Sequence, residues 1–581
     1  MSQRALSEAR YPLVLRGRNA RVVLTESIIS GRYAFTNEQF EAVQINDPLR
    51  ELSQATRKNM KRLFFVAVLS VCASASNSYG QTFATDDPTL RRIWALGMDS
   101  SLVYPLAQTL LDSIGPRLTG TPNQRAANEW AIAKYEGWGI PARAVEYGTW
   151  RGWRRGRTHI DLVAPRVRTL DGMMLAWSPG TQRPVEGEAI LLPTIPDSAA
   201  FAQWLSQVSG KFVLTSAAQP SCRPDSQWRQ TALPETFEKM QKERSALMAG
   251  WASNLRNTGL DPIELVRALE RAGAVGIVTS LWSGGWGVTK VFQARTESAP
   301  TVELSCEDYG LVFRLAHNRQ GPRLRVEADA ALLGEVPVAN VIGEIKGTEK
   351  PDEYVLLSAH FDSWDGSSGA TDNGTGTITM MEAMRILRTV YPRPKRTIMV
   401  GHWSGEEQGL NGSRAFAADN PAVVKGLQAL FNQDNGTGRV ATISMQGLTG
   451  AGEFFARWFA KLPTELTRNI TLAIPGLPGR GGSDYASFLC YGAPAFNLSS
   501  LSWEYGTYTW HTNRDTFDKI IFDELKMNAT LTAMLAYLAS EDPERISRKQ
   551  RVLPTSSQQA GPPSGWPACT QPARSSAESR R

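Results

Sequence analysis

Five short polar clusters contain the residues of this chain that are best suited to catalysis or metal binding. Each lies at or near the end of a predicted strand or helix: His360-Phe-Asp362, Asp372-Asn-Gly374, Gly405-Glu-Glu407, Gln433-Asp-Asn435 and Trp510-His-Thr512. Imidazole nitrogens and carboxylate oxygens are the ligands that suit zinc in hydrolytic sites. If the clusters meet in space, they would form a metal site that can activate water.

Each cluster taken alone also has an ordinary structural explanation. Asp372 could cap a helix, and Glu406 with Glu407 could simply be solvated. A single histidine is more often packed or at the surface than bound to a metal. Five such clusters at the ends of neighbouring elements favour a shared site over five separate explanations. We interpret His402, inside a predicted strand, as a packed residue.

The elements that would position these clusters follow one another as strand, loop and helix. Apolar runs at 354–359, 397–404 and 427–432 predict buried strands, and 376–390 predicts an amphipathic helix. This alternation indicates an α/β fold with a mixed, largely parallel sheet flanked by helices. Since the carboxyl ends of parallel strands meet at one edge of a sheet, the loops that follow them can converge there.

The rest of the chain divides by composition. Residues 82–155 have a helical pattern, and we expect 82–170 to be the first part of a catalytic domain. Short β-rich runs over 171–335 predict an inserted β-rich module, and 336–544 would complete the catalytic domain with the metal site. The tail, 545–581, is rich in Ser, Pro, Gln and Arg, which predicts disorder.

A targeting signal is predicted inside the N-terminal region. Lys61 and Arg62 precede an apolar stretch and the small residues Ala73-Ser-Ala75, so 60–80 has the pattern of a signal peptide. Because such peptides begin a protein, we expect translation to start at Met60 and 1–59 to be a mis-called upstream extension. The protein would be secreted or periplasmic. No apolar run reaches the ~20 residues that span a bilayer, so no stable membrane span is expected.

The distribution of charge argues against nucleic acid as a partner. The formal net charge is +7, but residues 1–59 carry nine basic against six acidic side chains, and 545–581 carry seven against one. The body between them is therefore net acidic. A nucleic-acid surface needs its positive charge on the folded body.

The cysteines exclude one kind of metal site. Beyond the predicted leader the chain has Cys222, Cys306, Cys490 and Cys569, widely spaced and without a CxxC pair. A cysteine-based zinc site is therefore excluded. One or two disulfides are compatible with an oxidising compartment, and the sequence leaves their pairing open.

Two longer segments carry a family resemblance. Ser358-Ala-His-Phe-Asp-Ser-Trp-Asp-Gly-Ser-Ser-Gly-Ala-Thr-Asp372, together with Trp403-Ser-Gly-Glu-Glu-Gln-Gly409, resembles the carboxypeptidase Q branch of the two-zinc exopeptidases. Gly482-Ser-Asp484 and Ile114–Gly120 resemble further segments of that family, so the likeness covers about 90–541. It implies a metallopeptidase that hydrolyses dipeptides or short peptides. It also implies that 171–335 is an inserted protease-associated domain.

The same resemblance implies roles for single residues and two zinc ions as cofactors. It assigns one zinc to His360, Asp372 and Asp434, and the other to Asp372, Glu407 and His511. Glu406 would be the general base. Asp362 would accept the second imidazole N–H of His360 and so orient that ligand.

Two other functions compete with this interpretation. An aminopeptidase of the same fold would act on the N-termini of longer peptides. Arg480 and Arg514 could meet a substrate carboxylate and Glu504 an amine, and the sequence leaves this choice open. A metal-free, receptor-like binding protein is disfavoured because all five ligand residues and Glu406 are present. Peptides are the expected partners, and a homodimer is left open.

Overall fold

The computed structural model describes residues 14–17, 20–23, 85–434, 437–552 and 565–578. The chain divides into two compact units, residues 1–80 and 81–581. In the first, β1 (Val14–Gly17) and β2 (Ala20–Val23) form an antiparallel pair. The predicted signal peptide at 60–80, with its start at Met60, and most of the predicted extension at 1–59 lie outside the described residues.

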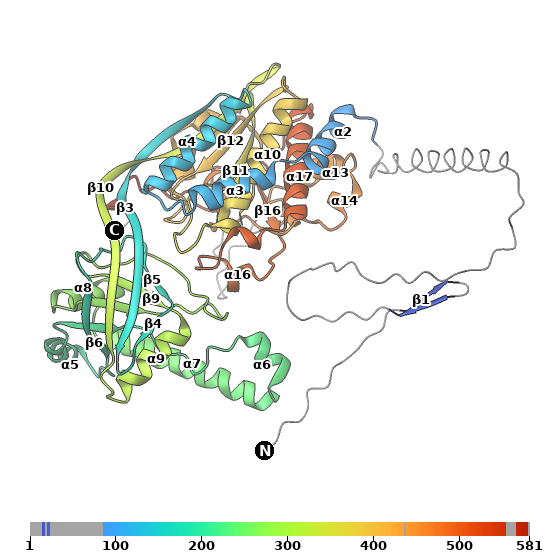
Figure 1. The fold of residues 1–581 in the computed structure, drawn as a ribbon. Coiled ribbons are helices and arrows are strands. Elements are labelled where there is room, and N and C mark those ends of the chain that lie inside the picture. Colours follow the sequence, from blue (N-terminus) through green and yellow to red (C-terminus); the bar gives the residue numbers. More distant parts are fainter. Residues whose placement is uncertain (1–13, 18–19, 24–84, 435–436, 553–564, 579–581) are drawn as a thin grey trace, which may run out of the picture. The chain divides into compact units, whose positions relative to one another are not determined.

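A mixed sheet forms the centre of the second unit (Figure 1). Its parallel strands are, in spatial order, β16 (Ala495–Ser500), β13 (Leu427–Asn432), β11 (Lys350–His360) and β12 (Arg396–Trp403). The outer pairings are antiparallel, between β14 (Val440–Ser444) and β16 and between β10 (Arg323–Ile345) and β12. The prediction of an α/β fold with a mixed, largely parallel sheet is confirmed.

Helices cover both faces of this sheet because its buried strands point apolar side chains alternately to the two sides. Leu357 of β11 belongs to the core that includes α10 (Thr375–Val390) and α17 (Phe522–Glu541). Its neighbour Leu356 belongs to the core that includes α11 (Asn411–Asp419). Across the described ranges, no helix combines the length and the hydrophobicity needed to cross a membrane.

Strands β3 (Ala142–Ala164) and β10 pair with each other to form a long antiparallel ribbon (Figure 1). The prediction that residues 82–155 are helical is therefore wrong beyond α4 (Pro122–Gly137). Register shifts interrupt the pairing, and such irregularities obscure the alternation that would reveal a strand. Strand β10 pairs with β12 near its carboxyl end and with β6 (Val185–Leu191) near its amino end. One sheet therefore continues from the central parallel strands to β6.

We call the residues between the two ribbon strands, 165–322, the insert. Its strands β6, β7 (Lys211–Leu214), β8 (Gly276–Thr279) and β9 (Thr301–Leu304) pair in parallel in that order. Helices α5 (Ser198–Trp204), α8 (Pro262–Arg271) and α9 (Cys306–His317) alternate with them. The sequence predicts a β-rich module over 171–335, but the structure shows strands alternating with helices, and 323–335 belong to β10.

The C-terminal segment 565–578 is ordered and packed, so the prediction of a disordered tail over 545–581 is wrong for these residues. A disulfide joins Cys569 to Cys490, and a second joins Cys222 to Cys306. The indole N–H of Trp566 donates to the carbonyl of Leu489 at 2.9 Å. A segment with few apolar residues is thus held by a covalent bond and polar contacts, which composition does not reveal. Residues 553–564 lie outside the described part of the chain.

Glu303 on β9 is a buried carboxylate whose protonation makes the stability of the insert depend on pH. It is fully buried and accepts a hydrogen bond from the backbone N–H of Leu281. Burial raises the pKa of Glu303 from 4.5 to about 8. Between these two values the folded state binds one proton more than the unfolded state, so wild-type stability falls as the pH rises through this window.

We therefore expect Glu303→Gln to raise Tm relative to the wild type at pH 7.5 by more than at pH 5. Thermal unfolding at both pH values measures this difference. Glu186→Gln, at a half-exposed glutamate of the insert, is the control and should show no comparable change. A gain that is equal at both pH values would show that proton uptake by Glu303 is not its cause.

Candidate metal centre

The structure brings the five predicted ligand residues together in two overlapping groups. One group contains His360, Asp372 and Asp434, and the other contains Asp372, Glu407 and His511. Within each group the candidate donor atoms lie within 4.8 Å of one another. Asp372 belongs to both groups, as a ligand shared by two ions must.

The parallel strands explain this convergence. His360 is the last residue of β11, and Glu407 and Asp434 follow the carboxyl ends of β12 and β13. His511 lies in the loop region after β16, and Asp372 lies just before α10. Loops at the carboxyl ends of adjacent parallel strands open onto one crevice, so residues distant in sequence meet there.

Asp372 presents one carboxylate oxygen to each histidine. Its Oδ1 is 3.2 Å from Nε2 of His360, and its Oδ2 is 3.2 Å from Nε2 of His511. Burial by itself would raise the pKa of Asp372, but the two imidazoles that face it lower the pKa below its ordinary value. An ionised carboxylate with one oxygen directed to each side has the geometry of a bridging ligand.

Backbone and ring contacts orient the two histidines. Nδ1 of His360 lies 3.0 Å from the carbonyl oxygen of Asp362, so Nδ1 carries the proton and Nε2 is left to face Asp434 at 3.2 Å. Nε2 of His511 lies 2.9 Å from Oε2 of Glu407. The ring of Trp510 stacks on that of His511, with centroids 4.0 Å apart. The Nδ1 contact fixes the tautomer and direction of the His360 imidazole, and the stacked Trp510 ring restrains the direction of the His511 imidazole.

Asp362 occupies the site, but its carboxylate has a different partner from the one expected. The imidazole N–H of His360 donates to the backbone carbonyl of Asp362, and the nearest carboxylate oxygen is 3.7 Å away. The carboxylate instead accepts the backbone N–H groups of Glu406 and Glu407, both at 3.2 Å. Asp362 therefore positions the loop of the two glutamates.

Arg117 is a residue of the site that was not predicted from the sequence. Its guanidinium is fully buried and donates to the carbonyls of Phe361 at 2.8 Å, Ser368 at 2.7 Å and Gly369 at 2.9 Å. Burial lowers its pKa to about 10, although the charge of Asp515 opposes this. Arg117 therefore fixes the loop that joins His360 to Asp372. Its partners are backbone atoms of a distant loop, which no side-chain pattern indicates.

Asp515 is a second residue of the site that was not predicted from the sequence. Its two carboxylate oxygens accept the backbone N–H groups of Thr371 at 2.8 Å and Asp372 at 3.0 Å. Burial raises the pKa of Asp515 to about 7, and hydrogen bonds from Thr371 oppose this. Asp515 thus holds the backbone of the shared ligand. Its place four residues after His511 is the only sequence signal that could have pointed to it.

We expect Asp515→Asn to weaken metal binding by roughly 10–100-fold, the usual effect of losing a group that orients a ligand. The amide retains one acceptor oxygen, so one of the two backbone N–H groups loses its partner. Competition with a chelator measures the affinity. Asp523→Asn, at an exposed aspartate of α17, is the control and should bind as the wild type does. Metal affinity equal to that of the wild type in Asp515→Asn would show that Asp515 does not position Asp372 for metal binding.

The centre contains more carboxylates than side chains that could donate hydrogen bonds to them. This excess of acidic groups indicates whether the site suits a bound cation. Burial raises the pKa values of Glu407 and Asp484 to about 7, and that of Glu406 well above its ordinary range. Among the residues that the structure describes, Oε1 of Glu407 and Nδ1 of His511 have no hydrogen-bond partner. A buried excess of carboxylates with unmet lone pairs is what bound cations would compensate. The nitrogen and oxygen donor set fits zinc.

Glu406 lies beside the ligands without belonging to either group. Together with Asp372, Asp434 and His511 it lines an open cavity of about 290 Å³. The carboxylate can therefore face a substrate held at the centre. His402, four residues earlier, is buried away from the ligands and bonded to the hydroxyl of Tyr135 at 2.7 Å. That position agrees with its interpretation as a packed strand residue.

The insert holds the loop that carries His511. The backbone N–H of Val291 donates to the carbonyl of His511 at 2.7 Å, and that of Asn513 donates to the carbonyl of Thr289 at 3.0 Å. Nζ of Lys290 donates to the carbonyl of Trp510 at 3.0 Å. His511 has a φ of +58°, a conformation that non-glycine residues adopt rarely, so these contacts help to secure it.

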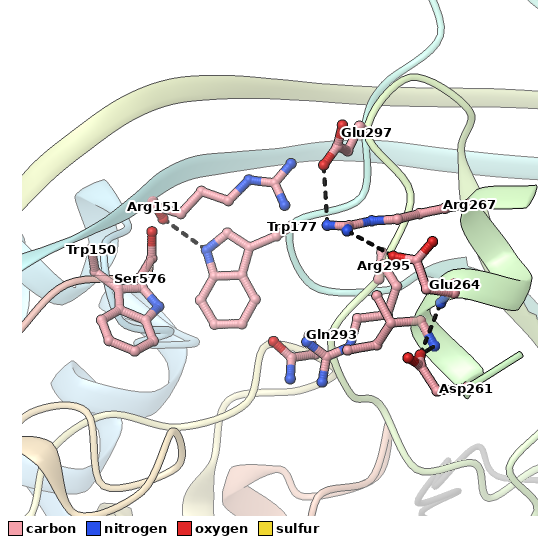
Figure 2. Close-up of a pocket in the computed structure, with 12 residues that line it drawn as sticks. Trp150, Arg151, Trp177, Asp261, Glu264, Arg267, Gln293, Arg295, Glu297 and Ser576 are labelled. Carbon is pink, nitrogen blue, oxygen red and sulfur yellow. Dashed lines mark hydrogen bonds and ion pairs between the residues drawn. The ribbon is translucent and has the colours of Figure 1, made fainter. Parts of the chain in front are cut away.

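A separate cavity of about 210 Å³ lies between the insert, β3 and the C-terminal segment (Figure 2). Its charged side chains are partnered within the protein. Arg267 contacts Glu264 at 3.4 Å and Glu297 at 3.2 Å, and the indole of Trp177 donates to the carbonyl of Arg151 at 2.8 Å (Figure 2). None of the predicted ligand residues lines it, so we do not place the active site there.

Comparison with known proteins shows similarity to a peptidase family and to two curated relatives. Residues 340–536 match the profile of Peptidase family M28. Carboxypeptidase Q of Rattus norvegicus is 25% identical over 447 residues, which cover 77% of this chain and 86% of the relative. Carboxypeptidase Q of Homo sapiens is 23% identical over 445 residues, with the same coverage.

Among solved structures, a peptidase M28 precursor from Shewanella amazonensis shares the fold. Its TM-score is 0.56 at 24% identity, over 79% of this chain and 97% of that one. The predicted resemblance to the carboxypeptidase Q branch is confirmed. That the insert is a protease-associated domain stays a prediction.

Proposed function

We propose that this chain is a zinc-dependent exopeptidase of dipeptides or short peptides. Its residues 340–536 match Peptidase family M28, and the chain is a metallopeptidase. The observation that carries this proposal is the pair of ligand groups that share Asp372, a residue that lines one open cavity together with Glu406. Two zinc ions held by these groups would lower the pKa of a water molecule and polarise the peptide carbonyl. His360 and Asp434 would hold one ion, Glu407 and His511 the other, and Asp372 both.

Glu406 would move the proton in this reaction. It accepts a proton from the attacking water, whose oxygen bonds to the carbonyl carbon, and later passes the proton to the leaving amine as the C–N bond breaks. Burial and the nearby charge of Asp434 raise the pKa of Glu406, although His360 opposes them. A raised pKa suits a group that must both accept and return a proton. Asp362 holds the backbone of Glu406 in place during these steps.

The position of the insert supports a preference for short substrates. Its residues 289–291 bond to the loop of His511, so part of the insert stands beside the centre. A partly covered crevice admits short peptides more easily than folded proteins. We propose that the insert limits the length of the substrate.

A panel of dipeptides tests the proposal. We expect the purified protein to hydrolyse free dipeptides, to lose activity with a chelator and to regain it with zinc, and to contain two zinc ions by elemental analysis. Loss of cleavage on blocking the substrate carboxylate would identify a carboxypeptidase, and loss on blocking the amine an aminopeptidase. If the zinc-loaded protein cleaves none of these peptides, the proposal fails.

We also propose that the protein acts outside the cytosol. Its two disulfides fit an oxidising compartment such as the periplasm or the extracellular space. N-terminal sequencing of exported protein is expected to give a mature N-terminus near Ser76 or Gln81. Recovery of residues 1–59 on the exported protein would refute processing at the predicted signal.

A further inference from the structure

A larger cavity of about 620 Å³ adjoins the metal centre. Its main walls are Trp286, Val288, Trp503, Tyr505 and Tyr508. Tyr505 also lines the smaller cavity at the metal centre, and Thr371, the residue before the shared ligand, lines the larger cavity. A substrate held at the metal centre could therefore extend a side chain into this space.

We propose that this cavity is a side-chain subsite that selects peptides with a bulky apolar residue, above all an aromatic one. The inference rests on the proposed peptidase function and narrows its substrate class. Its volume lies within the roughly 300–1,000 Å³ of small-molecule sites. Trp286 and Trp503 are 48% and 56% exposed, so a substrate side chain that packs on them removes apolar surface from water.

The charged residues of this cavity favour an apolar occupant. Nζ of Lys519 lies 2.6 Å from Oδ2 of Asp518, and Arg514 lies 3.5 Å from Asp171. These cations already have anionic partners. The remaining charged lining residue, Glu504, is exposed and would repel an acidic substrate side chain. The cavity therefore matches a Phe, Tyr, Trp or Leu side chain better than Asp or Glu.

Trp286 makes the insert part of this subsite. The guanidinium of Arg223 lies 5.3 Å from the centre of its ring, a cation–π contact within the insert. On the other side, the side-chain amide of Asn513 donates to the carbonyl of Gly287 at 3.0 Å. Trp286 is thus held on one side by its own region and on the other by the loop that follows His511. We assign it as a specificity-determining residue.

The experiment compares kcat/KM for two dipeptide series, Xaa–Ala and Ala–Xaa, with Xaa as Ala, Leu, Phe or Glu. In one of the two series the wild type is expected to prefer Phe over Ala by at least roughly 10–200-fold, the range that an apolar pocket achieves for a single methylene group. Trp286→Ala should lower this ratio about tenfold, and Trp286→Phe should retain most of it. Leu233→Ala, at another exposed apolar residue of the insert that does not line the cavity, should keep the wild-type ratio.

A Phe-to-Ala ratio in Trp286→Ala equal to that of the wild type would overturn the inference. This includes an equal loss on every peptide, which would show a general structural effect. If no peptide is cleaved, the proposed function fails separately, and isothermal titration calorimetry of Phe–Ala, Ala–Phe and Ala–Ala then decides the inference. If the cavity is such a subsite, the wild type binds one of the aromatic peptides more tightly than Trp286→Ala does. Equal affinities of the two proteins would reject the inference.

Discussion

Replacement of Glu406 by glutamine is expected to leave the fold and the metal content intact and to lower kcat by roughly 10²–10⁴-fold, the usual cost of removing a general base. Glutamine has the same shape but cannot accept a proton from water at its amide. Glu406 belongs to neither ligand group, so both groups keep their donors. Steady-state kinetics of the zinc-loaded variant on a dipeptide gives the effect, and elemental analysis checks the metal.

The control is Glu453→Gln, at an exposed glutamate of α13 (Ala451–Phe459). It should hydrolyse the same dipeptide at the wild-type rate. A wild-type rate in Glu406→Gln would show that another group accepts the proton. Loss of metal from that variant would instead make Glu406 a ligand.

Asp372→Ala is expected to abolish binding of both ions and with it all measurable activity. The reason is the geometry of the carboxylate, whose two oxygens each lie 3.2 Å from a different histidine. One substitution removes a ligand from each group and the negative charge that separates two cations. Elemental analysis after dialysis measures the number of zinc ions retained.

Two further variants sharpen this test. Asp434 belongs to one group only, so Asp434→Ala should lose one ion and keep the other. Asp542→Asn changes a buried aspartate that is paired with Arg457 at 2.7 Å and belongs to neither group, so it should keep both ions. Two tightly bound zinc ions in Asp372→Ala would reject the shared-ligand assignment.

The sequence predicted the central strands well and the ribbon badly. The runs at 354–359 and 427–432 are continuous apolar segments because parallel strands are buried on both faces, and the structure places β11 and β13 there. Strand β3 has exposed or half-buried residues along much of its length, so its composition does not distinguish it from a surface helix. The C-terminal segment was missed because Cys569 is fixed by a partner 79 residues away.

The candidate site also contains residues that could be predicted from the sequence and residues that could not. His360 and Asp434 could be found because their side-chain chemistry and their places at the ends of predicted strands are visible in the sequence, and His511 because of its imidazole and the family resemblance. Arg117 and Asp515 act on backbone atoms of a distant loop, and such partners leave no pattern of residue types. For Asp362 the position was right but the bond was wrong, because spacing does not decide whether a carbonyl or a carboxylate meets the imidazole.

The hydrogen bonds between the insert and the loop of His511 have a consequence for how the enzyme matures. Lys290 and Trp510 are 220 residues apart in sequence, and contacts of such long range are slow to form. We therefore expect the second ligand group to be completed only after the insert has folded and docked. Since metal binding stabilises only the state in which its site exists, full zinc loading would mark chains that have finished folding, and chains with a misfolded insert would stay metal-poor and inactive.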